Sequence, residues 1–420
     1  MRSRFRPRGV ALILSGTVVG QGLVVAVSPL LTRFYRPEDF GALAVVTAIA
    51  SVIGAGATAG TDRALVVAGD DRGVHALLWA GSLSITATGT VVAVAAWALR
   101  GWTSAVFVTT VLESSWWVLP VSVVAVGAHR LASAVLARRE QHRAIGLRNA
   151  VQGISQTAWN LLASAAGPVG LVGGLAAGRL VAVVGVGLRR PTPFSRVAVG
   201  HAVRHHRRFF LLTPWSAATN VLGQQAPALV FAALHGATAA GLVALTMRVL
   251  GAPVGMLADA VAQYAAGAFG RVRRSGGPMA PLVGRLVSRL AIAGAVGVLV
   301  AVVVGPGAFG SVFGAEWAVS GEYARILVPA FAAQVAVSPV TQVLAMVGQQ
   351  AAQLAWDVGR LVLTTGAVLV PSALGASVPV VLAALAVAMV VAYGAMLAMV
   401  VAVVRWAPAA AARVPTAEES

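Results

Sequence analysis

Three arginines, Arg179, Arg248 and Arg360, fall inside long apolar stretches of the sequence, where a positive charge is unusual. A guanidinium stays ionised in proteins and presents a planar set of donors that matches the oxygens of a phosphate. At membrane depth such a charge costs several kcal/mol unless an anion or water compensates it. Arg248 has no acidic residue close to it in the sequence, so the pattern predicts a phosphate-binding role for it.

Three acidic residues, Glu113, Asp259 and Asp357, also fall inside apolar stretches. Asp357 and Arg360 are three residues apart, so on a helix they lie on one face and can neutralise each other. Two interpretations stay open for Glu113, which neighbours Trp116: a protonatable site, or an interfacial residue outside the true span. The three carboxylates are our candidates for ion coupling, that is, for binding a proton or a sodium ion, and a structural role is the alternative for each.

Amide side chains repeat at helical spacing in several of the apolar stretches. Polar groups that face lipid are costly, so each stripe is expected to face other helices or a hydrated cavity. Hydrogen bonding between helices explains a single polar residue well, but it needs fewer amides than these stripes contain. We therefore expect a polar cavity lined by Asn149, Gln152, Gln156, Asn160, Asn220, Gln224 and Gln353.

Other chemistries find little support in the sequence. It contains no cysteine, and the H-x-x-x-H pattern from His201 to His205 lacks a third ligand nearby, so we expect no metal site and no cofactor. The net charge of +18 could indicate nucleic acid. However, the basic residues are all arginines that lie between apolar stretches, which favours anionic lipids as their partners and excludes nucleic acid.

The composition defines the elements that must position these residues. Of the 420 residues, 58% are hydrophobic and 10% are charged. A soluble domain carries roughly 25% charged residues, so most of this surface must face something other than water. The sequence therefore predicts an all-α polytopic membrane protein.

Crossing the hydrocarbon layer takes about 20 mostly apolar residues in a helix. Twelve stretches meet this requirement, which are 10–31, 42–60, 77–98, 105–128, 149–167, 168–188, 209–233, 239–262, 286–304, 324–347, 351–370 and 379–402. When the connections are placed alternately on two sides, most of the 31 arginines fall on one side. Under the positive-inside rule, that side is cytoplasmic and holds both termini of a multi-pass protein of the cell membrane.

The two halves resemble distant copies of each other, with an offset near 200 residues. Gly41-Ala-Leu-Ala matches Gly241-Leu-Val-Ala, and the spacing of Asn149, Gln152 and Gln156 recurs later, at 350, 353 and 357. Copies of six spans each have the same orientation, so they are related by a pseudo-two-fold axis along the membrane normal. We expect an N-terminal six-helix lobe (1–190), a cytoplasmic basic linker (191–208), a C-terminal six-helix lobe (209–404) and a cytoplasmic tail (405–420), with a central cavity.

Four motifs carry a resemblance to a known family. They are S-P-L-L-T-R-F-Y-R-P-E-D-F-G at 28–41, D-R-A-L-V-V-A at 62–68, a G-x-x-x-x-x-x-R-x-x-x-x-P pattern at 241–253, and F-G-A-E-W at 313–317 with G-E-Y-A-R-I-L at 321–327. Together they resemble the bacterial polysaccharide and oligosaccharide flippases of lipopolysaccharide biosynthesis. These flippases are members of the multidrug/oligosaccharidyl-lipid/polysaccharide exporter superfamily.

The resemblance implies twelve helices in two lobes around a central cavity. The implied substrate is an undecaprenyl-diphosphate-linked oligosaccharide, moved from the cytoplasmic to the outer leaflet, with glycosyltransferases and a polysaccharide polymerase as partners. Arg248 matches its motif, and so does Arg33, whose place at the expected outer end leaves head-group binding or a structural role open. This sequence has no lysine, so phosphate binding falls to arginine. Arg248, together with Arg179 and Arg360, would neutralise the diphosphate, and the amide stripes would contact sugar hydroxyls.

Three other functions compete with this interpretation. A drug–cation antiporter of the same superfamily would need an acidic, aromatic cavity, whereas these spans are balanced or basic. A membrane glycan polymerase, which is an enzyme, commonly carries a large outer loop that this sequence lacks, so we expect no enzymatic activity. A scaffold protein of an envelope-assembly complex would need no hydrated cavity.

Overall fold

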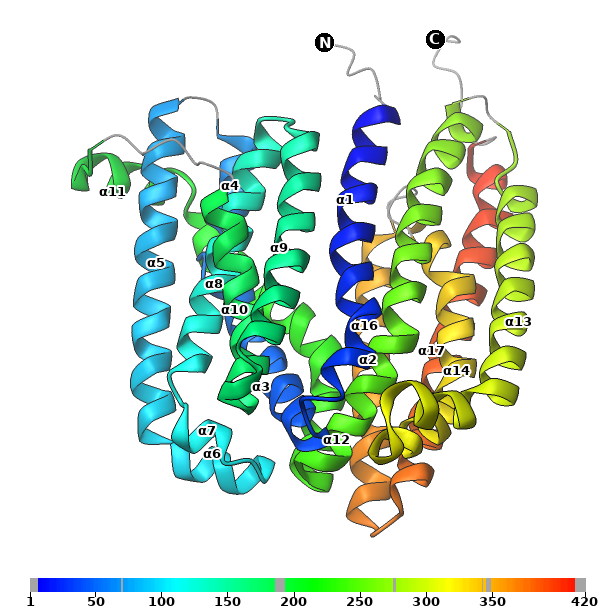
Figure 1. Ribbon diagram of the computed structural model, residues 1–420. Helices are drawn as coiled ribbons and strands as arrows, with labels where there is room; N and C mark the ends of the chain where they lie inside the picture. Colours follow the sequence, from blue (N-terminus) through cyan, green and yellow to red (C-terminus); the bar gives the residue numbers. More distant parts are fainter. Residues whose placement is uncertain are drawn as a thin grey trace, which may run out of the picture. The chain divides into compact units, whose positions relative to one another are not determined.

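The computed structural model describes residues 7–68, 71–185, 193–274, 277–341, 343–344 and 349–411. Nearly all of these residues are helical, and no strand occurs among them (Figure 1). The chain forms two compact units. Unit 1 contains residues 1–245 and 310–317, and unit 2 contains residues 246–309 and 318–420. The boundaries expected for the two lobes and for the linker stay predictions.

Unit 1 contains the first half of the chain and the start of one long helix. Its helices are α1 (Pro7–Ala26), α2 (Ser28–Leu31), α3 (Pro37–Gly56), α4 (Thr61–Val67), α5 (Asp71–Ala98), α6 (Arg100–Phe107), α7 (Val111–Ser114), α8 (Val118–Arg138), α9 (His142–Leu162), the 3-10 helix η1 (Ser164–Ala166), α10 (Pro168–Gly185), α11 (Arg196–His205) and the first part of α12 (Arg207–Arg274). Gly236, with φ of 77°, breaks α12 into two helical parts.

Unit 2 contains the rest of α12, from Thr246 onward. Its other helices are α13 (Ala280–Phe313, of which residues from 310 belong to unit 1), α14 (Ala318–Val337), the 3-10 helix η3 (Ser338–Val340), α16 (Gln350–Ala373) and α17 (Val378–Ala411). A buried cluster that includes Phe269, Leu344 and Met396 forms its core.

Most expected spans are confirmed as helices. Nine helices in the described ranges are long and apolar enough to cross a membrane, and the one at Phe209–Ala258 holds two expected spans. The other two expected spans fall on α1 and α9. The span expected at 105–128 is wrong in its bounds: the membrane-length helix is α8, from Val118 to Arg138. The chain breaks at Val108, whose φ is 50°, and Glu113 lies in the short helix α7 before that span.

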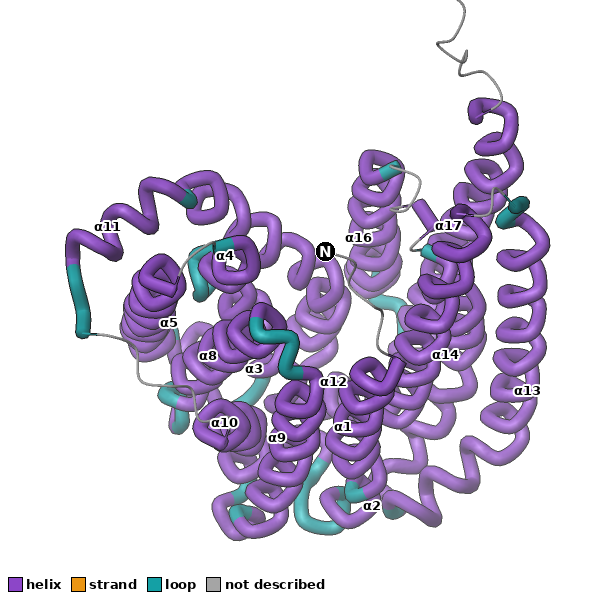
Figure 2. The backbone as a smooth tube through the Cα atoms, turned by 90° about the horizontal axis from the view of Figure 1, so that it is seen from above, coloured by secondary structure: helices purple, strands orange, loops and turns teal. Residues whose placement is uncertain are grey.

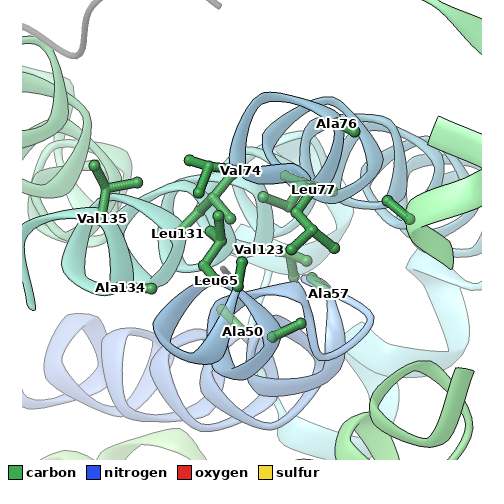
Figure 3. Close-up of a cluster of buried hydrophobic side chains, with 14 of the residues drawn as sticks. Ala50, Ala57, Leu65, Val74, Ala76, Leu77, Val123, Leu131, Ala134 and Val135 are labelled. Atoms are coloured by element: carbon green, nitrogen blue, oxygen red, sulfur yellow. The ribbon is translucent and has the colours of Figure 1, made fainter. Parts of the chain in front are cut away.

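Large aliphatic side chains hold α4, α5 and α8 together in unit 1. Leu65, Leu77 and Val123 are fully buried and meet between these helices (Figure 3). Leu131 and Val135 extend the same cluster along α8, so the buried face of α8 repeats at helical spacing. This packing fixes the helix that carries part of the candidate site.

Helices α1 and α9 lie side by side (Figure 2), and their backbones approach each other closely at glycines. A Cβ atom added to Gly16 would overlap the backbone of Gly146, and one added to Gly153 would overlap the backbone of Gly20. Small residues permit this approach of two backbones, which is common where helices associate in membranes. The contact sets the distance between α1 and the polar residues of α9.

Two segments that the sequence predicts to be copies of each other meet inside unit 1. A Cβ atom on Gly41 would overlap the carbonyl oxygen of Ala237, and one on Gly241 would overlap the carbonyl oxygen of Pro37. Each residue pairs with the residue about 200 positions away, and exchanging the copies turns one contact into the other. A reciprocal contact of this kind is what a two-fold relation produces.

Candidate functional site

Three basic side chains from three adjacent helices form what we call the cationic cluster of unit 1. His129 comes from α8, Arg148 from α9 and Arg179 from α10, and these helices pack against one another. The charges of Arg148 and Arg179 both act on the His129 ring. Arg148 is only 7% exposed, while His129 and Arg179 are half-buried.

Hydrogen bonds hold Arg148 in place from both sides. Its Nη1 donates to Ser133 Oγ of α8, and its Nη2 donates to Asn149 Oδ1 at 2.8 Å. Asn149 Nδ2 in turn donates to Thr17 Oγ1 of α1 at 2.8 Å. This chain of bonds runs from α8 through α9 to α1, so the guanidinium is fixed before any ligand arrives.

Part of the hydrogen-bonding capacity of the cationic cluster is unused. Arg148 Nε, Arg179 Nη1 and His129 Nδ1 are buried and have no hydrogen-bond partner among the described residues. Leaving one such group unsatisfied costs about 1–3 kcal/mol. Across the same ranges, no ion pair joins any of the three residues to a carboxylate. The cluster therefore holds positive charge that its surroundings do not balance.

The acidic residue of α4 that contacts α8 is already engaged. Asp62 accepts from Arg130 Nη2 at 2.9 Å and from Thr58 Oγ1 at 2.9 Å. On the same side of unit 1, Arg138 donates to the backbone carbonyls of Leu65 and Ala68, where α4 ends. These bonds tie α4 to α8, so Asp62 has a structural role.

The amide stripe of α9 is packed rather than open. Asn160 is 1% exposed, and its amide nitrogen can donate to the carbonyls of Gln156 and Leu171 at 3.2 Å. Opposite these side chains, α10 presents Gly174 and Gly178, whose missing side chains make room for the amides. Contacts between helices thus account for the burial of Asn160 and Gln156, and a cavity-lining role for them stays a prediction.

Tyr35 contacts the end of this stripe that is farther from Arg148 along α9. Its hydroxyl donates to the Asn160 carbonyl at 2.7 Å. Burial, with a smaller effect of the Asp39 charge, raises the pKa of Tyr35 to about 12, so the hydroxyl stays protonated and keeps donating. The Asp39 carboxylate itself accepts from the Arg36 amide at 2.9 Å, which starts α3 directly after the extended Arg36.

Of the remaining amides in the predicted cavity, two form a separate pair. Gln224 Nε2 donates to Asn220 Oδ1 at 3.1 Å on the exposed face of α12. Gln152 in unit 1 and Gln353 in unit 2 are half-buried. The predicted stripes therefore belong to helices of both units, with Gln353 in unit 2 and the others in unit 1.

In unit 2, Arg360 has local partners. Its guanidinium lies 3.8 Å from the Asp357 carboxylate and 4.8 Å from the centre of the Trp356 ring. Trp356 is itself anchored by a hydrogen bond to the Ala392 carbonyl at 2.6 Å. Arg360 is thus compensated by an acid and an aromatic face. Arg248 is half-buried in the unit 2 part of α12.

Of the other predicted charges, Arg33 and Glu113 have exposed side chains. Arg33 is exposed and donates to the Val312 carbonyl at 3.4 Å. Near it, Phe40 and Trp317 form an edge-on ring contact at 4.9 Å, so the motifs at 28–41 and 313–317 meet in space. Glu113 is exposed and accepts from Ser104 Oγ at 3.3 Å. Asp259 belongs to α12, but its side chain lies outside the described residues.

Sequence reasoning missed two members of the cationic cluster, His129 and Arg148. Both fall in the stretch 129–148, which the arginine count assigned to a cytoplasmic loop. The structure instead continues α8 to Arg138 and starts α9 at His142. One signal could have revealed Arg148: it precedes Gln152 by four residues and so extends the amide stripe by one helical turn.

The chain belongs to the polysaccharide biosynthesis protein family, whose model matches residues 30–322. This match confirms the resemblance carried by the motifs. No curated protein sequence matches the chain.

Solved structures share the fold. The lipid II flippase MurJ in an inward closed conformation superimposes with a TM-score of 0.72 at 10% identity, covering 99% of this chain and 94% of that one. An inward-facing multidrug resistance MATE family transporter of the MOP superfamily gives 0.64 at 13% identity, over 97% of this chain and 100% of that one. A MOP superfamily transporter from Pyrococcus furiosus gives 0.60 at 12% identity, over 95% of each chain. The protein is therefore a multi-pass membrane protein with the fold of this superfamily.

Proposed function

We propose that this protein is a flippase that moves an undecaprenyl-diphosphate-linked oligosaccharide from the cytoplasmic to the outer leaflet of the cell membrane. Both termini would lie in the cytoplasm, and the glycan would serve cell-surface polysaccharide assembly. One observation carries the proposal: the cationic cluster of unit 1 holds positive charge that no described carboxylate balances. A substrate with a diphosphate at membrane depth provides the opposite charge.

The comparisons support the same class of substrate. The family is described by polysaccharide biosynthesis, and one structural neighbour is named a lipid II flippase. A lipid-linked glycan combines an apolar tail, an anionic diphosphate and a polar sugar. The tail would stay in the bilayer while arginines, including Arg248, neutralise the diphosphate and amides contact the sugars. Glycosyltransferases and a polymerase would act before and after this step.

The competing functions fit the charge distribution less well. A drug–cation antiporter needs uncompensated acid, yet the Asp357 carboxylate is paired with Arg360 and Asp62 with Arg130. A scaffold protein would account for the packed amides of α9. It would not account for a cluster of basic groups that no described carboxylate balances, because an unbalanced buried charge destabilises a protein that has no use for it.

Coupling to protons or sodium ions would require a carboxylate that can change its charge within the membrane. Asp357 is the candidate we retain in unit 2, because its side chain is 31% exposed and its partner Arg360 is 3.8 Å away. Ion binding at Asp357 would release Arg360 for a phosphate. Glu113 is exposed on α7, before the span, so we place it in an interfacial role.

Transport by the purified protein tests the proposal. Proteoliposomes would carry a fluorescent undecaprenyl-diphosphate-linked oligosaccharide, and a reducing quencher outside would report how fast the glycan changes leaflet. We expect the rate to rise with the amount of protein and to fall in Arg248→Gln, with Arg325→Gln as a control at an exposed ion pair. An unchanged leaflet distribution, with cation uptake in the same vesicles, would favour the antiporter instead.

A further inference from the structure

The predicted cations of this chain differ in what surrounds them. Arg360 is paired with Asp357, and Arg33 is exposed and bonded to a backbone carbonyl. In the cationic cluster, by contrast, no described carboxylate pairs with any of the three residues, and their nitrogens without partners belong to three different helices. An anion bound at the cluster would therefore remove the free-energy cost of leaving these nitrogens without partners.

We propose that His129, Arg148 and Arg179 form a binding site for a phosphate-class anion inside unit 1. The proposal rests on the proposed function, and it assigns the diphosphate of the lipid-linked glycan to this cluster. It adds Arg148 and His129, which the sequence motifs did not indicate, to the substrate-binding residues. Arg148 forms the closed back of the site, because 93% of it is buried, and His129 and Arg179 keep part of their surface accessible.

The arrangement of donors favours phosphate over a carboxylate. The free nitrogens are Nε of Arg148, Nη1 of Arg179 and Nδ1 of His129, and each comes from a different helix. A phosphate group offers several oxygens in a tetrahedron and can accept from donors on several helices, whereas a carboxylate offers two oxygens in a plane. With a bound anion, His129 Nδ1 would act as a donor.

The surroundings strengthen any charge interaction at this site. Arg148 is only 7% exposed, and Ala132, three residues after His129 on α8, is buried, so water has limited access to this part of the cluster. In such a medium, attraction between opposite charges is several times stronger than in water. The repulsion that Arg148 and Arg179 each exert on a protonated His129 is stronger for the same reason, and a bound anion would relieve it.

Binding to the purified full-length protein in nanodiscs gives the direct test, with inorganic diphosphate and undecaprenyl diphosphate as probes. We expect Arg148→Gln and Arg179→Gln each to weaken binding by at least about tenfold. Arg143→Gln is the matched control, because Arg143 is exposed on the same helix as Arg148. It should leave affinity unchanged. Equal affinity in all variants would overturn the site.

A second readout guards against variants that merely unfold. If the cluster is strained without its anion, replacing Arg179 by Met should raise the thermal stability of the ligand-free protein while abolishing binding. Diphosphate should raise the melting temperature of the unaltered protein and not that of Arg179→Met. A variant that loses stability and is still stabilised by diphosphate would contradict the proposal.

A competition experiment distinguishes two sources of the phosphate, which are the diphosphate of the lipid-linked glycan and the head group of a phospholipid. Nanodiscs of phosphatidylcholine alone and nanodiscs with one third phosphatidylglycerol would be compared. Unchanged diphosphate affinity supports the glycan diphosphate, and strong competition by phosphatidylglycerol overturns it in favour of a lipid head-group site. Failure of the flippase proposal gives a different result: diphosphate binds with the expected variant pattern, but no glycan changes leaflet.

Discussion

Helix α9 in unit 1 and helix α16 in unit 2 correspond to each other in the predicted internal repeat, yet their charged side chains have opposite surroundings. On α9, Arg148 lies beside two more basic groups and no described carboxylate pairs with it. On α16, Arg360 has an acid one turn away and an aromatic ring beneath it. Similar polar helices thus carry an anion site in one unit and an arginine paired with an acid in the other.

The two helices also differ in how closely other backbones approach their glycines. Gly153 of α9 lies against the backbone of Gly20, while Gly359 and Gly366 of α16 have open space where a Cβ atom would lie. Helix α9 is therefore held rigidly along the face that carries its polar residues. Helix α16 has no such constraint at its glycines.

The largest expected effect on stability comes from glycine substitutions, which test the difference in packing between α9 and α16. Gly153→Ala forces a methyl group into the backbone of α1 and should destabilise the protein by about 3 kcal/mol. Gly359→Ala, the control on α16, should be neutral or stabilise by up to about 1 kcal/mol, because alanine favours a helix. Thermal unfolding in detergent measures both. Equal melting temperatures for the two variants would show that the α1–α9 contact contributes little.

An added acid should make α9 resemble α16. Ser133 accepts a hydrogen bond from Arg148, so Ser133→Asp places a carboxylate against the guanidinium. We expect diphosphate affinity to fall about 100-fold, which corresponds to roughly 3 kcal/mol. Ser133→Asn has nearly the same shape without the charge and should keep most of the affinity. Similar affinities for Asp and Asn at this position would separate Arg148 from the anion.

The reverse change should make α16 resemble α9. Asp357→Asn removes the acid from Arg360 and should destabilise the protein by about 1 kcal/mol, because the pair is partly exposed and therefore screened. Adding Arg360→Gln should recover most of this loss, since no unbalanced charge remains. A double-mutant cycle of melting temperatures measures the coupling. Additive losses would show that the two residues act independently.

The smallest expected effect is the pH dependence of stability that arises from His206, which lies between α11 and α12. Burial, with a smaller contribution from His205, lowers the pKa of His206 below its ordinary value of 6.5. The unfolded chain then binds a proton more readily than the folded one. Stability is therefore complete above pH 6.5 and falls slightly as the pH drops below it. His206→Gln should flatten this slope in thermal unfolding between pH 7 and 5, and an unchanged slope would assign it to other groups.

The helices were predictable from the sequence, because hydrophobic length is a strong signal in a membrane protein. The stretch 105–128 failed for a physical reason: hydropathy averages over Val108 and Ser115 without registering the backbone breaks there. The stretch 129–148 failed because arginines at the ends of helices resemble arginines in loops. Arg148 thus looked like a topological anchor, although it is buried.

The site could be predicted only in part. Sequence identified Arg179 as a charge at membrane depth, and the i, i+3 spacing indicated the pair of Asp357 with Arg360. It could not show that Asn160 faces Gly174, because the partner of a packed side chain lies on another helix. For the same reason, the proximity of His129 to Arg148 and Arg179 became visible only in three dimensions.

The reciprocal contact between Gly41 and Gly241 limits how the two copies of the repeat can diverge. Each glycine lies against the backbone that begins the other copy, at Ala237 and Pro37. A side chain gained in one copy is therefore obstructed by the other copy, and no change within its own half can relieve it. Both positions therefore admit only a residue without a side chain as long as the two backbones stay where they are. The contact makes the choice of residue at one position depend on a segment about 200 residues away.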